Sequence, residues 1–262
     1  MALPLPPGLT HPEVAFLAEM ELVTVVPRQR LEPIDLLGGK TPPLRPPHRT
    51  DLPLWLALLL KKQRRANILP PPWLHPASLA DIIHRETKVT PEAFSEPPPA
   101  PARADVSQPG RARRQGVDQE GDDGGIIMSA PFRPACTADA PAGYLPYHWQ
   151  EVAEALLAHA GDDVTAGTAG ATVSSAGEVR GLIRDLVEVR AAKMRSSTAQ
   201  LEGFGAGLMS LRGVGAMELA ESRGFVLGVV DGVRRIGASV EGARREAEEE
   251  REGEESDEDM GI

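Results

Sequence analysis

The chain has 262 residues, of which 41% are hydrophobic and only 4% aromatic, and its 25 prolines and 26 glycines are unevenly spread, so one or two domains with unfolded stretches are expected. The net charge is −10, but much of it lies in residues 241–262, so the rest of the chain is closer to neutral. The single cysteine, Cys136, excludes an internal disulfide framework and a multi-cysteine metal site.

The first 66 residues predict a small β-rich domain with a covering helix. Residues 22–26 are apolar and β-branched, which is typical of a short strand, and residues 31–37 are a second candidate. Residues 52–66 predict the helix, with Thr50 or Asp51 as its N-cap. A β unit of this size is marginal alone, so the helix is expected to pack on it.

Helical spacing dominates most of the remaining chain. Residues 67–91 are expected to begin a helical domain, with Ser78 capping a short helix. The domain resumes over residues 144–240, where apolar residues recur three and four positions apart. Its expected helices cover residues 145–160, 178–195, 197–212 and 214–237, and residues 161–177 are expected to form a loop.

Two segments have compositions typical of disorder. Residues 92–143 are dominated by proline, glycine and charge, which favours a disordered insertion. Residues 241–262 are strongly acidic and favour a disordered tail. The predicted fold class is therefore α+β, mainly α: a small β-rich N-terminal domain followed by an α-helical bundle domain, with a disordered insertion and an acidic tail.

No group of residues predicts a catalytic, cofactor-binding or metal site. The six histidines are scattered, with no pair at helical spacing and no nearby cysteine set. The sequence LLGGK at residues 36–40 lacks the earlier glycine of a phosphate-binding loop and favours a hairpin turn. Asp162 and Asp163 lie in glycine-rich surroundings, where fixed geometry and perturbed pKa values are not expected. We therefore expect a protein that is not an enzyme.

Residues 52–74 join an apolar run to a basic cluster, Lys61, Lys62, Arg64 and Arg65. The run falls well short of the about 20 residues that a bilayer span needs, so a membrane anchor is excluded. The cluster fits a solvated helix end, where cations suit the helix dipole. It also fits a contact with an acidic protein surface or with nucleic-acid phosphates.

Several stretches together resemble one family, the Psf-two subunit of the eukaryotic GINS complex. The resemblance does not extend to the insertion at residues 92–143, to residues 161–177 or to the acidic tail. It rests on EVAFLAEMELVTVVP (residues 13–27), LEPIDLLGG (31–39) and LPLWLALLLKKQRRANILPPPWL (52–74), and more weakly on EVRGLIRDLVEVRAAKMR (178–195) and AMELAE (216–221).

The resemblance implies a subunit without catalytic activity or cofactor. It implies assembly with Psf-one, Psf-three and Sld-five into a heterotetramer that joins the MCM ring and a RecJ-like cofactor as the nuclear replicative helicase. A direct DNA-binding module is the alternative function.

Partner-binding or interdomain roles are expected for residues on two helices. Helices 145–160, 178–195 and 214–237 are expected to bury part of their apolar stripes against other subunits, and the alternative is a self-contained bundle. The expected residues are Trp55, Leu56, Leu59, Lys61, Lys62, Arg64, Arg65, Leu182, Leu186 and Val189.

Overall fold

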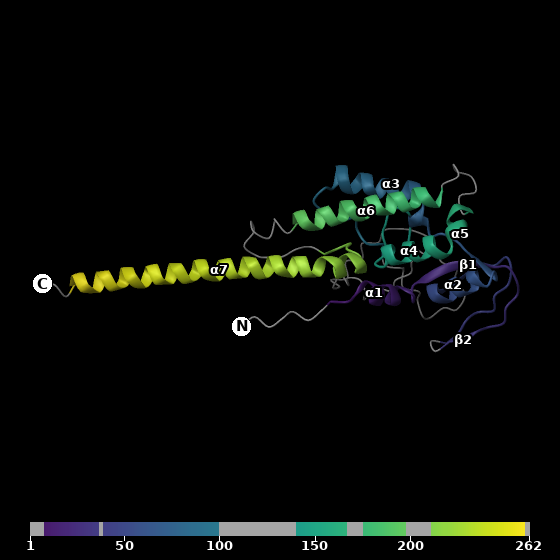
Figure 1. Ribbon diagram of the computed structural model, residues 1–262, viewed down its shortest axis with the longest axis horizontal. Coiled ribbons are helices and arrows are strands. Elements are labelled where there is room, and N and C mark those ends of the chain that lie inside the picture. The colour runs from purple at the N-terminus through teal and green to yellow at the C-terminus, as the bar shows by residue number, and fades with distance from the viewer. Residues whose placement is uncertain (1–7, 37–38, 100–139, 167–174, 198–210, 260–262) are drawn as a thin grey trace, which may run out of the picture.

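The computed structural model describes residues 8–36, 39–99, 140–166, 175–197 and 211–259. Figure 1 shows a strand-containing region at one end and a group of helices beside it. Helix α7 (Ala216–Asp259) starts among these helices and projects away from both.

A three-stranded antiparallel sheet forms the N-terminal region. Its strands are β1 (Leu22–Pro27), β4 (Thr50–Pro53) and β5 (Ala66–Ile68), with β1 in the middle. In β1, Val23 and Val25 are buried and the residues between them are half-buried, which is the period of two that a sheet with one covered face requires. The predicted strand over residues 22–26 is confirmed.

The second predicted strand is shorter than expected. Only β2 (Asp35–Leu36) and β3 (Gly39–Lys40) pair as strands here, and Leu31 forms an isolated bridge with Leu44. Pro33, Pro42 and Pro43 interrupt the stretch, and proline has no N–H to donate to a ladder. The turn was predicted at Gly38–Gly39; Gly39 begins β3, and residues 37–38 lie outside the described residues.

The covering helix is also shorter than predicted. Helix α2 (Leu54–Lys62) begins after Pro53, because Thr50–Pro53 pairs with β1 as strand β4. The prediction that Thr50 or Asp51 caps the helix is therefore wrong, and Asp51 Oδ1 instead accepts a hydrogen bond from Thr24 Oγ1 at 2.7 Å. At the other end, Arg64 adopts a left-handed conformation (φ 57°), and the chain turns into β5.

The remaining short and long helices pack beside the sheet and α2 and on one another. Ser78 does not cap α3: it lies in the helix, and its Oγ accepts a hydrogen bond from the Gly143 N–H at 2.9 Å. Residues 161–166, predicted as loop, are helical. The elements are α1 (His11–Ala18), η1 (Pro72–Leu74), α3 (Pro76–His84), the π-helix η2 (Arg85–Val89), α4 (Trp149–His159), α5 (Gly161–Ala166) and α6 (Ala176–Ser197).

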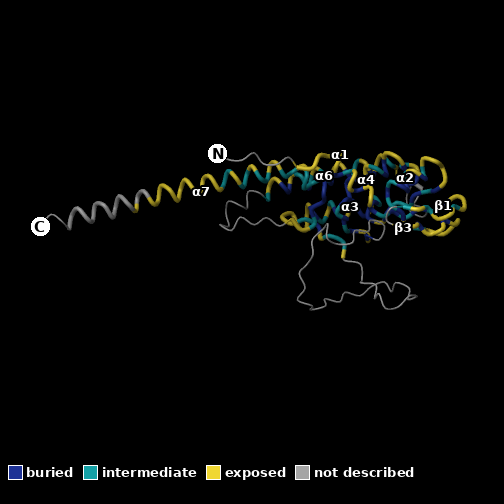
Figure 2. Tube along the Cα trace, turned by 90° about the horizontal axis from the view of Figure 1, so that it is seen from below, coloured by how far each residue is buried: buried dark blue, intermediate teal, exposed yellow. Residues whose placement is uncertain are grey.

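Side chains from the sheet and the helices form one continuous hydrophobic core, which Figure 2 shows in dark blue. The predicted order, a small strand-containing unit followed by a helical bundle, is confirmed, but the two units share this core. Its buried members include Val23, Val25, Leu52, Leu56, Leu60, Ile68, Trp73, Leu79, Ile82, Trp149, Val152, Leu156, Val179 and Leu186.

The insertion and the tail differ from their predicted limits. Residues 100–139 lie outside the described residues, whereas Ser95 and Gly143, inside the predicted insertion, are buried.

At the C-terminal end of the chain, α7 continues to Asp259, so the prediction of disorder from residue 241 is wrong. The tail sequence is rich in Glu and also contains Arg, both good helix formers, and Arg244 Nε pairs with Glu248 Oε1 one turn later at 3.0 Å. Residues 198–210, predicted to be mostly helical, are not described.

Candidate partner-binding surfaces

Helix α2 lies between the sheet and the helical region. It contacts β1, β4 and β5, and it also contacts α4. Leu54, Leu56, Ala57 and Leu60 are buried, as expected for a helix that is apolar on nearly every face. Leu56 is therefore placed where the two regions meet, inside the chain's own core.

Trp55 and Leu59 lie on the less covered side of α2. The Trp55 side chain is half-buried and packs against the margin of the core, and the Trp55 backbone N–H donates to the Glu19 carbonyl at 3.2 Å. Leu59 is 43% exposed. Of these two and Leu56, only Leu59 offers a large apolar surface to another molecule.

Lys61 is not part of the exposed basic surface; it forms ion pairs that join the two regions of the chain. Its side chain is 9% exposed, and its Nζ lies 2.7 Å from Asp162 Oδ2 and 2.8 Å from Asp163 Oδ1, both on α5. Asp163 also accepts a hydrogen bond from the Ile68 N–H of β5 at 2.7 Å. The expectation that these two aspartates lack fixed geometry is wrong.

The electrostatics of this contact follow from its geometry. Burial disfavours the charged Lys61 ammonium, but hydrogen bonds to Asp162 and Asp163 outweigh that effect and raise the pKa of Lys61. The hydrogen bond from Lys61 in turn lowers the pKa of Asp162. The expectation of an unperturbed pKa at Asp162 is therefore also wrong, and Lys61 is held by its own chain.

Lys62, Arg64 and Arg65 remain as a basic surface after Lys61 is removed. All three side chains are exposed, and no described carboxylate pairs with any of them. The Arg65 carbonyl accepts a hydrogen bond from the Arg28 N–H at 2.7 Å, so a fourth exposed cation lies on the neighbouring strand end. We call Lys62, Arg64 and Arg65 the basic surface.

Helices α4 and α6 turn most of their apolar stripes inward. Val152, Ala153, Leu156 and Leu157 of α4 are buried, so the expectation that this stripe contacts other subunits is wrong for these residues. Helix α6 shows the same: Val179, Ile183 and Leu186 are buried, whereas Leu182 and Val189 are half-buried. Of the residues predicted on α6, Leu186 lies inside the core, Leu182 packs against its margin and Val189 is half-buried.

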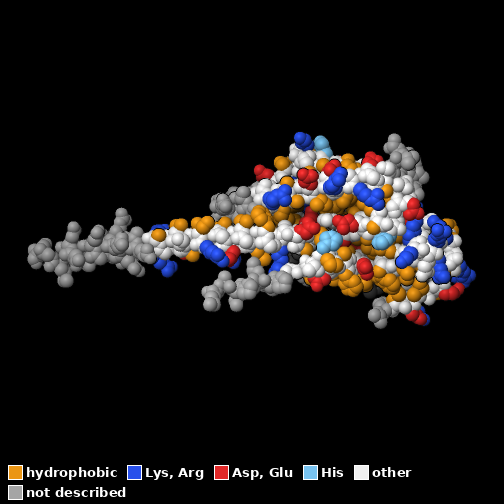
Figure 3. Space-filling view, viewed as in Figure 1, with side chains coloured by type: hydrophobic (Ala, Val, Ile, Leu, Met, Phe, Trp, Pro, Cys, Tyr) orange, Lys and Arg blue, Asp and Glu red, His pale blue; other side chains and the backbone are white. Residues whose placement is uncertain are grey.

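Helix α7 carries an apolar stripe that the described part of the chain covers only in part. Beyond its first turns the helix projects from the helical region (Figure 1), and hydrophobic side chains lie along the part of it whose side chains are described (Figure 3). Ile236 is 67% exposed, and the other members are half-buried or exposed. We define the α7 stripe as Val226, Val229, Val233, Ile236 and Val240.

The sequence alone predicts a stripe of Val226, Val229, Val230 and Val233, which shares three residues with the α7 stripe and lacks its continuation. Ile236 and Val240 were overlooked because the helix was expected to end near them. The signal was present, since the five residues follow one another at alternating spacings of three and four. That spacing is typical of a helix that packs along another helix.

Helix α1 presents a second exposed apolar face. Its inner residues Val14 and Ala18 are buried, whereas Phe16 on the outer side is 69% exposed. No role is assigned to this face from the sequence alone. A shallow hollow on this face is lined by Leu9, Pro12, Glu13, Phe16 and Leu17.

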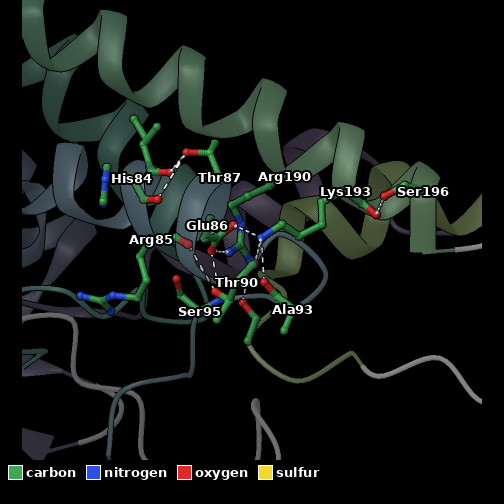
Figure 4. A network of polar contacts seen from close by, with 12 residues as sticks. His84, Arg85, Glu86, Thr87, Thr90, Ala93, Ser95, Arg190, Lys193 and Ser196 are labelled. Atoms are coloured by element: carbon green, nitrogen blue, oxygen red, sulfur yellow. Dashed lines mark hydrogen bonds and ion pairs between the residues drawn. The ribbon is translucent and has the colours of Figure 1, made fainter.

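A buried cluster of charged groups lies at the C-terminal half of α6 (Figure 4). Arg190 donates through Nη1 to Glu86 Oε1 and through Nε to Glu218 Oε1. Its Nη2 donates to Glu218 Oε2 at 2.9 Å and to the Gly213 carbonyl at 2.7 Å. One guanidinium therefore joins η2, α6, the turn before α7 and α7 itself.

Lys193 completes this cluster on the side of Glu86. Its Nζ donates to Glu86 Oε2 at 3.3 Å and to the carbonyls of Thr90 and Ala93 at 3.1 and 2.7 Å. Burial alone would raise the pKa of Glu86, but the charge of Arg190 and the Ser95 N–H outweigh it and hold that pKa below its usual 4.5. We call Glu86, Arg190, Lys193 and Glu218 the ionic network.

The described residues provide neither a metal-binding group nor a membrane-spanning helix. No group of three or more His, Cys, Asp or Glu side chains among them is placed to hold a metal ion. None of their helices combines the length and apolar character that a bilayer crossing needs. The surfaces above are therefore the candidates that the described residues provide.

Comparison with known proteins gives matches along most of the chain. Residues 10–69 match the family described as PSF2 N-terminal domain, and residues 73–237 match the family described as GINS complex protein helical bundle domain. The DNA replication complex GINS protein psf2 of Neurospora crassa is 67% identical over 281 residues, which cover 100% of both chains. The corresponding protein of Gibberella zeae is 67% identical over 92% of this chain and 90% of its own.

A more distant relative extends over a similar length. The DNA replication complex GINS protein psf2 of Schizosaccharomyces pombe is 28% identical over 238 residues, which cover 90% of this chain and 96% of that protein. The helical bundle match spans the elements from η1 into α7, including the ionic network. The chain belongs to the PSF2 family of GINS DNA replication complex proteins.

Proposed function

We propose that this chain is a non-catalytic structural subunit of the heterotetrameric GINS complex. In this proposal it acts in the initiation and elongation of chromosomal DNA replication, in the nucleus, as part of the MCM-based replicative helicase. Its partners are Psf-one, Psf-three and Sld-five within the tetramer, and the MCM ring and a RecJ-like cofactor beyond it. The names of the relatives, each a DNA replication complex GINS protein, support the coarser part of this proposal.

The α7 stripe is the observation that carries the proposal. Apolar side chains that gather on a protein surface mark a site of protein association, and Ile236 and Val240 of the stripe are exposed. The alternating spacing of three and four places the stripe along one line of α7, which suits a helix of another subunit. A role in association also agrees with a stripe that consists of apolar side chains.

The test is a pair of substitutions within the stripe and a matched control. Val233→Gln with Ile236→Gln removes two apolar side chains at the centre of the stripe, and Ala238→Gln introduces the same side chain on the opposite side of α7. Burying each side chain is worth roughly 1.5–3 kcal/mol, so the double variant should weaken assembly at least about a hundredfold.

The measurement is co-purification of the tagged chain with the other three subunits, followed by titration of the affinity. The Ala238→Gln control should assemble as the wild type does. Equal recovery of the three subunits with the double variant and with the control would show that the α7 stripe does not make the contact.

A direct DNA-binding module is the second candidate. The observation that favours it is the basic surface, because Lys62, Arg64 and Arg65 are exposed and no described carboxylate neutralises them. Phosphate contacts of this kind need exposed cations without counter-charges. Lys61 is left out of this candidate, because Asp162 and Asp163 already bind it.

A salt titration tests this candidate. If the basic surface binds phosphates, affinity for a labelled DNA duplex falls steeply with salt, and changing the three residues to Gln reduces the log–log slope by up to about 0.9 per residue. Fluorescence anisotropy across a range of salt concentrations measures this slope. A purified chain without salt-dependent affinity, or a triple variant with the wild-type slope, would reject the second candidate.

A further inference from the structure

Helix α7 is held to the rest of the chain near its beginning. The elements that pack against it are α1 and α6, and Met217 and Ala216 form a small apolar cluster with Val14 of α1. The helix has 44 residues, and most of its length extends away from these contacts. Its direction is therefore determined by the contacts at its first turns.

Arg190 makes the central polar contact at this root. Its guanidinium donates two parallel hydrogen bonds to the Glu218 carboxylate, and a third goes to the Gly213 carbonyl in the turn that precedes α7. Such a planar, two-bond contact fixes orientation as well as distance. Because the Arg190 side chain is 1% exposed, water does not compete for these bonds.

Glu218 links Arg190 to the backbone at the start of α7. Its Oε2 accepts a hydrogen bond from the Gly215 N–H at 2.7 Å, so one carboxylate binds both Arg190 and the first turn of α7. The Ala216 N–H donates to the Tyr147 carbonyl at 2.9 Å. The turn is also tightly packed: Gly213 has a φ of 83°, and a Cβ there would lie 2.1 Å from the Ser95 carbonyl oxygen.

The other half of the ionic network anchors Arg190 itself. Glu86 binds Arg190, Lys193 and the Ser95 N–H, and Lys193 binds the carbonyls of Thr90 and Ala93 (Figure 4). The guanidinium is therefore held from η2 and the following residues on one side and directs α7 on the other. Buried ionic groups of this kind are weak contributors to net stability, and their best-attested use is to specify one geometry.

We propose that Arg190 is a positioning residue that fixes the direction in which α7 leaves the helical region, acting through Glu218. Loss of the Arg190–Glu218 contact is expected to leave the apolar core folded while α7 samples several directions. As far as it concerns partners, the inference rests on the proposed function: a fixed direction presents the α7 stripe to other subunits in one orientation.

The experiment measures the direction of α7 by distances between spin labels on the full-length chain. Cys136→Ser removes the native thiol, and labels are attached at Ala158→Cys on α4 and Ala238→Cys on α7, both exposed positions. A second label pair, Ala80→Cys and Ala158→Cys, reports the helical region alone. Glu218→Gln is the test variant, because it keeps the shape but loses an acceptor for Arg190 and Gly215.

A single narrow distance distribution is expected for the α4–α7 pair in the wild type. Glu218→Gln should broaden it or add a second maximum, while the α3–α4 pair stays unchanged. Arg190→Lys, which keeps the charge but loses the parallel hydrogen bonds, should broaden it in the same way. Arg235→Met, which removes the exposed pair with Asp231 on the same helix, should leave both distributions as in the wild type.

Two results would overturn the inference. One is an α4–α7 distribution in Glu218→Gln as narrow as in the wild type, and the other is a broad distribution already in the wild type. Broadening of both label pairs together would assign the network to general stability and would also reject a positioning role. These outcomes do not depend on assembly, so failure of the wild-type chain to join other subunits would contradict the proposed function alone.

Discussion

Leu56→Asp is expected to destabilise the chain by about 3–5 kcal/mol, which is the range for loss of a large buried side chain. Leu56 is 3% exposed and lies where α2 meets the sheet and α4. The aspartate would lose apolar contacts and would also bury a charge without a partner, which adds to the cost. The midpoint of urea denaturation, followed by circular dichroism, measures the change.

Leu59→Asp on the same helix is the matched control. Leu59 is 43% exposed, so the same substitution should change the free energy of unfolding by no more than about 0.5 kcal/mol. Trp55→Ala is expected to fall between the two, because Trp55 is half-buried. Equal denaturation midpoints for Leu56→Asp and Leu59→Asp would contradict the position given to α2.

Glu86→Gln should also destabilise the chain strongly, by about 3–5 kcal/mol, because removing one partner of a buried ion pair leaves a charge uncompensated. The Glu86 side chain is fully buried, and it binds both Arg190 and Lys193. Glu92→Ala removes an exposed carboxylate from the same stretch and should have little effect. Urea denaturation at neutral pH compares the two variants.

The same residue predicts an acid-sensitive part of the stability. Because the folded pKa of Glu86 is depressed below 4.5, its contribution is fully present above that value and is lost as pH falls through the folded pKa. The wild-type urea midpoint should therefore fall more steeply below about pH 4.5 than that of Glu86→Gln. Parallel curves for the two proteins over that range would show that Glu86 is not bound as a carboxylate in the folded chain.

The spacing of hydrophobic residues predicted the elements that need only one apolar face to be buried. The alternating burial of Val23 and Val25 and the apolar stripe of α4 can be read from spacing alone, because each needs only one covered face. The strand Thr50–Pro53 could not be predicted in this way. Its backbone groups bond to β1, which is distant in the sequence, and that pairing overrides the capping preference of Thr50 and Asp51.

Long-range charge pairs account for most of what was overlooked at the surfaces. Lys61 looks like a member of a basic surface cluster, and only folding brings Asp162 and Asp163 to it. Arg190 gave a clearer signal, because it continues the spacing of Val179, Ile183 and Leu186 on the buried face of α6. A charged residue at such a position needs a buried partner, but spacing does not say that the partners are Glu86 and Glu218.

The most direct test of the central claim, that this chain works by association, is native mass spectrometry of the full-length chain co-expressed with Psf-one, Psf-three and Sld-five. If the chain is a subunit of the heterotetramer, one dominant species that contains one copy of each of the four chains is expected. Substitution of the α7 stripe should shift the population to free chain and smaller species. A wild-type chain that is recovered only as a monomer while the other three subunits are present would contradict the account.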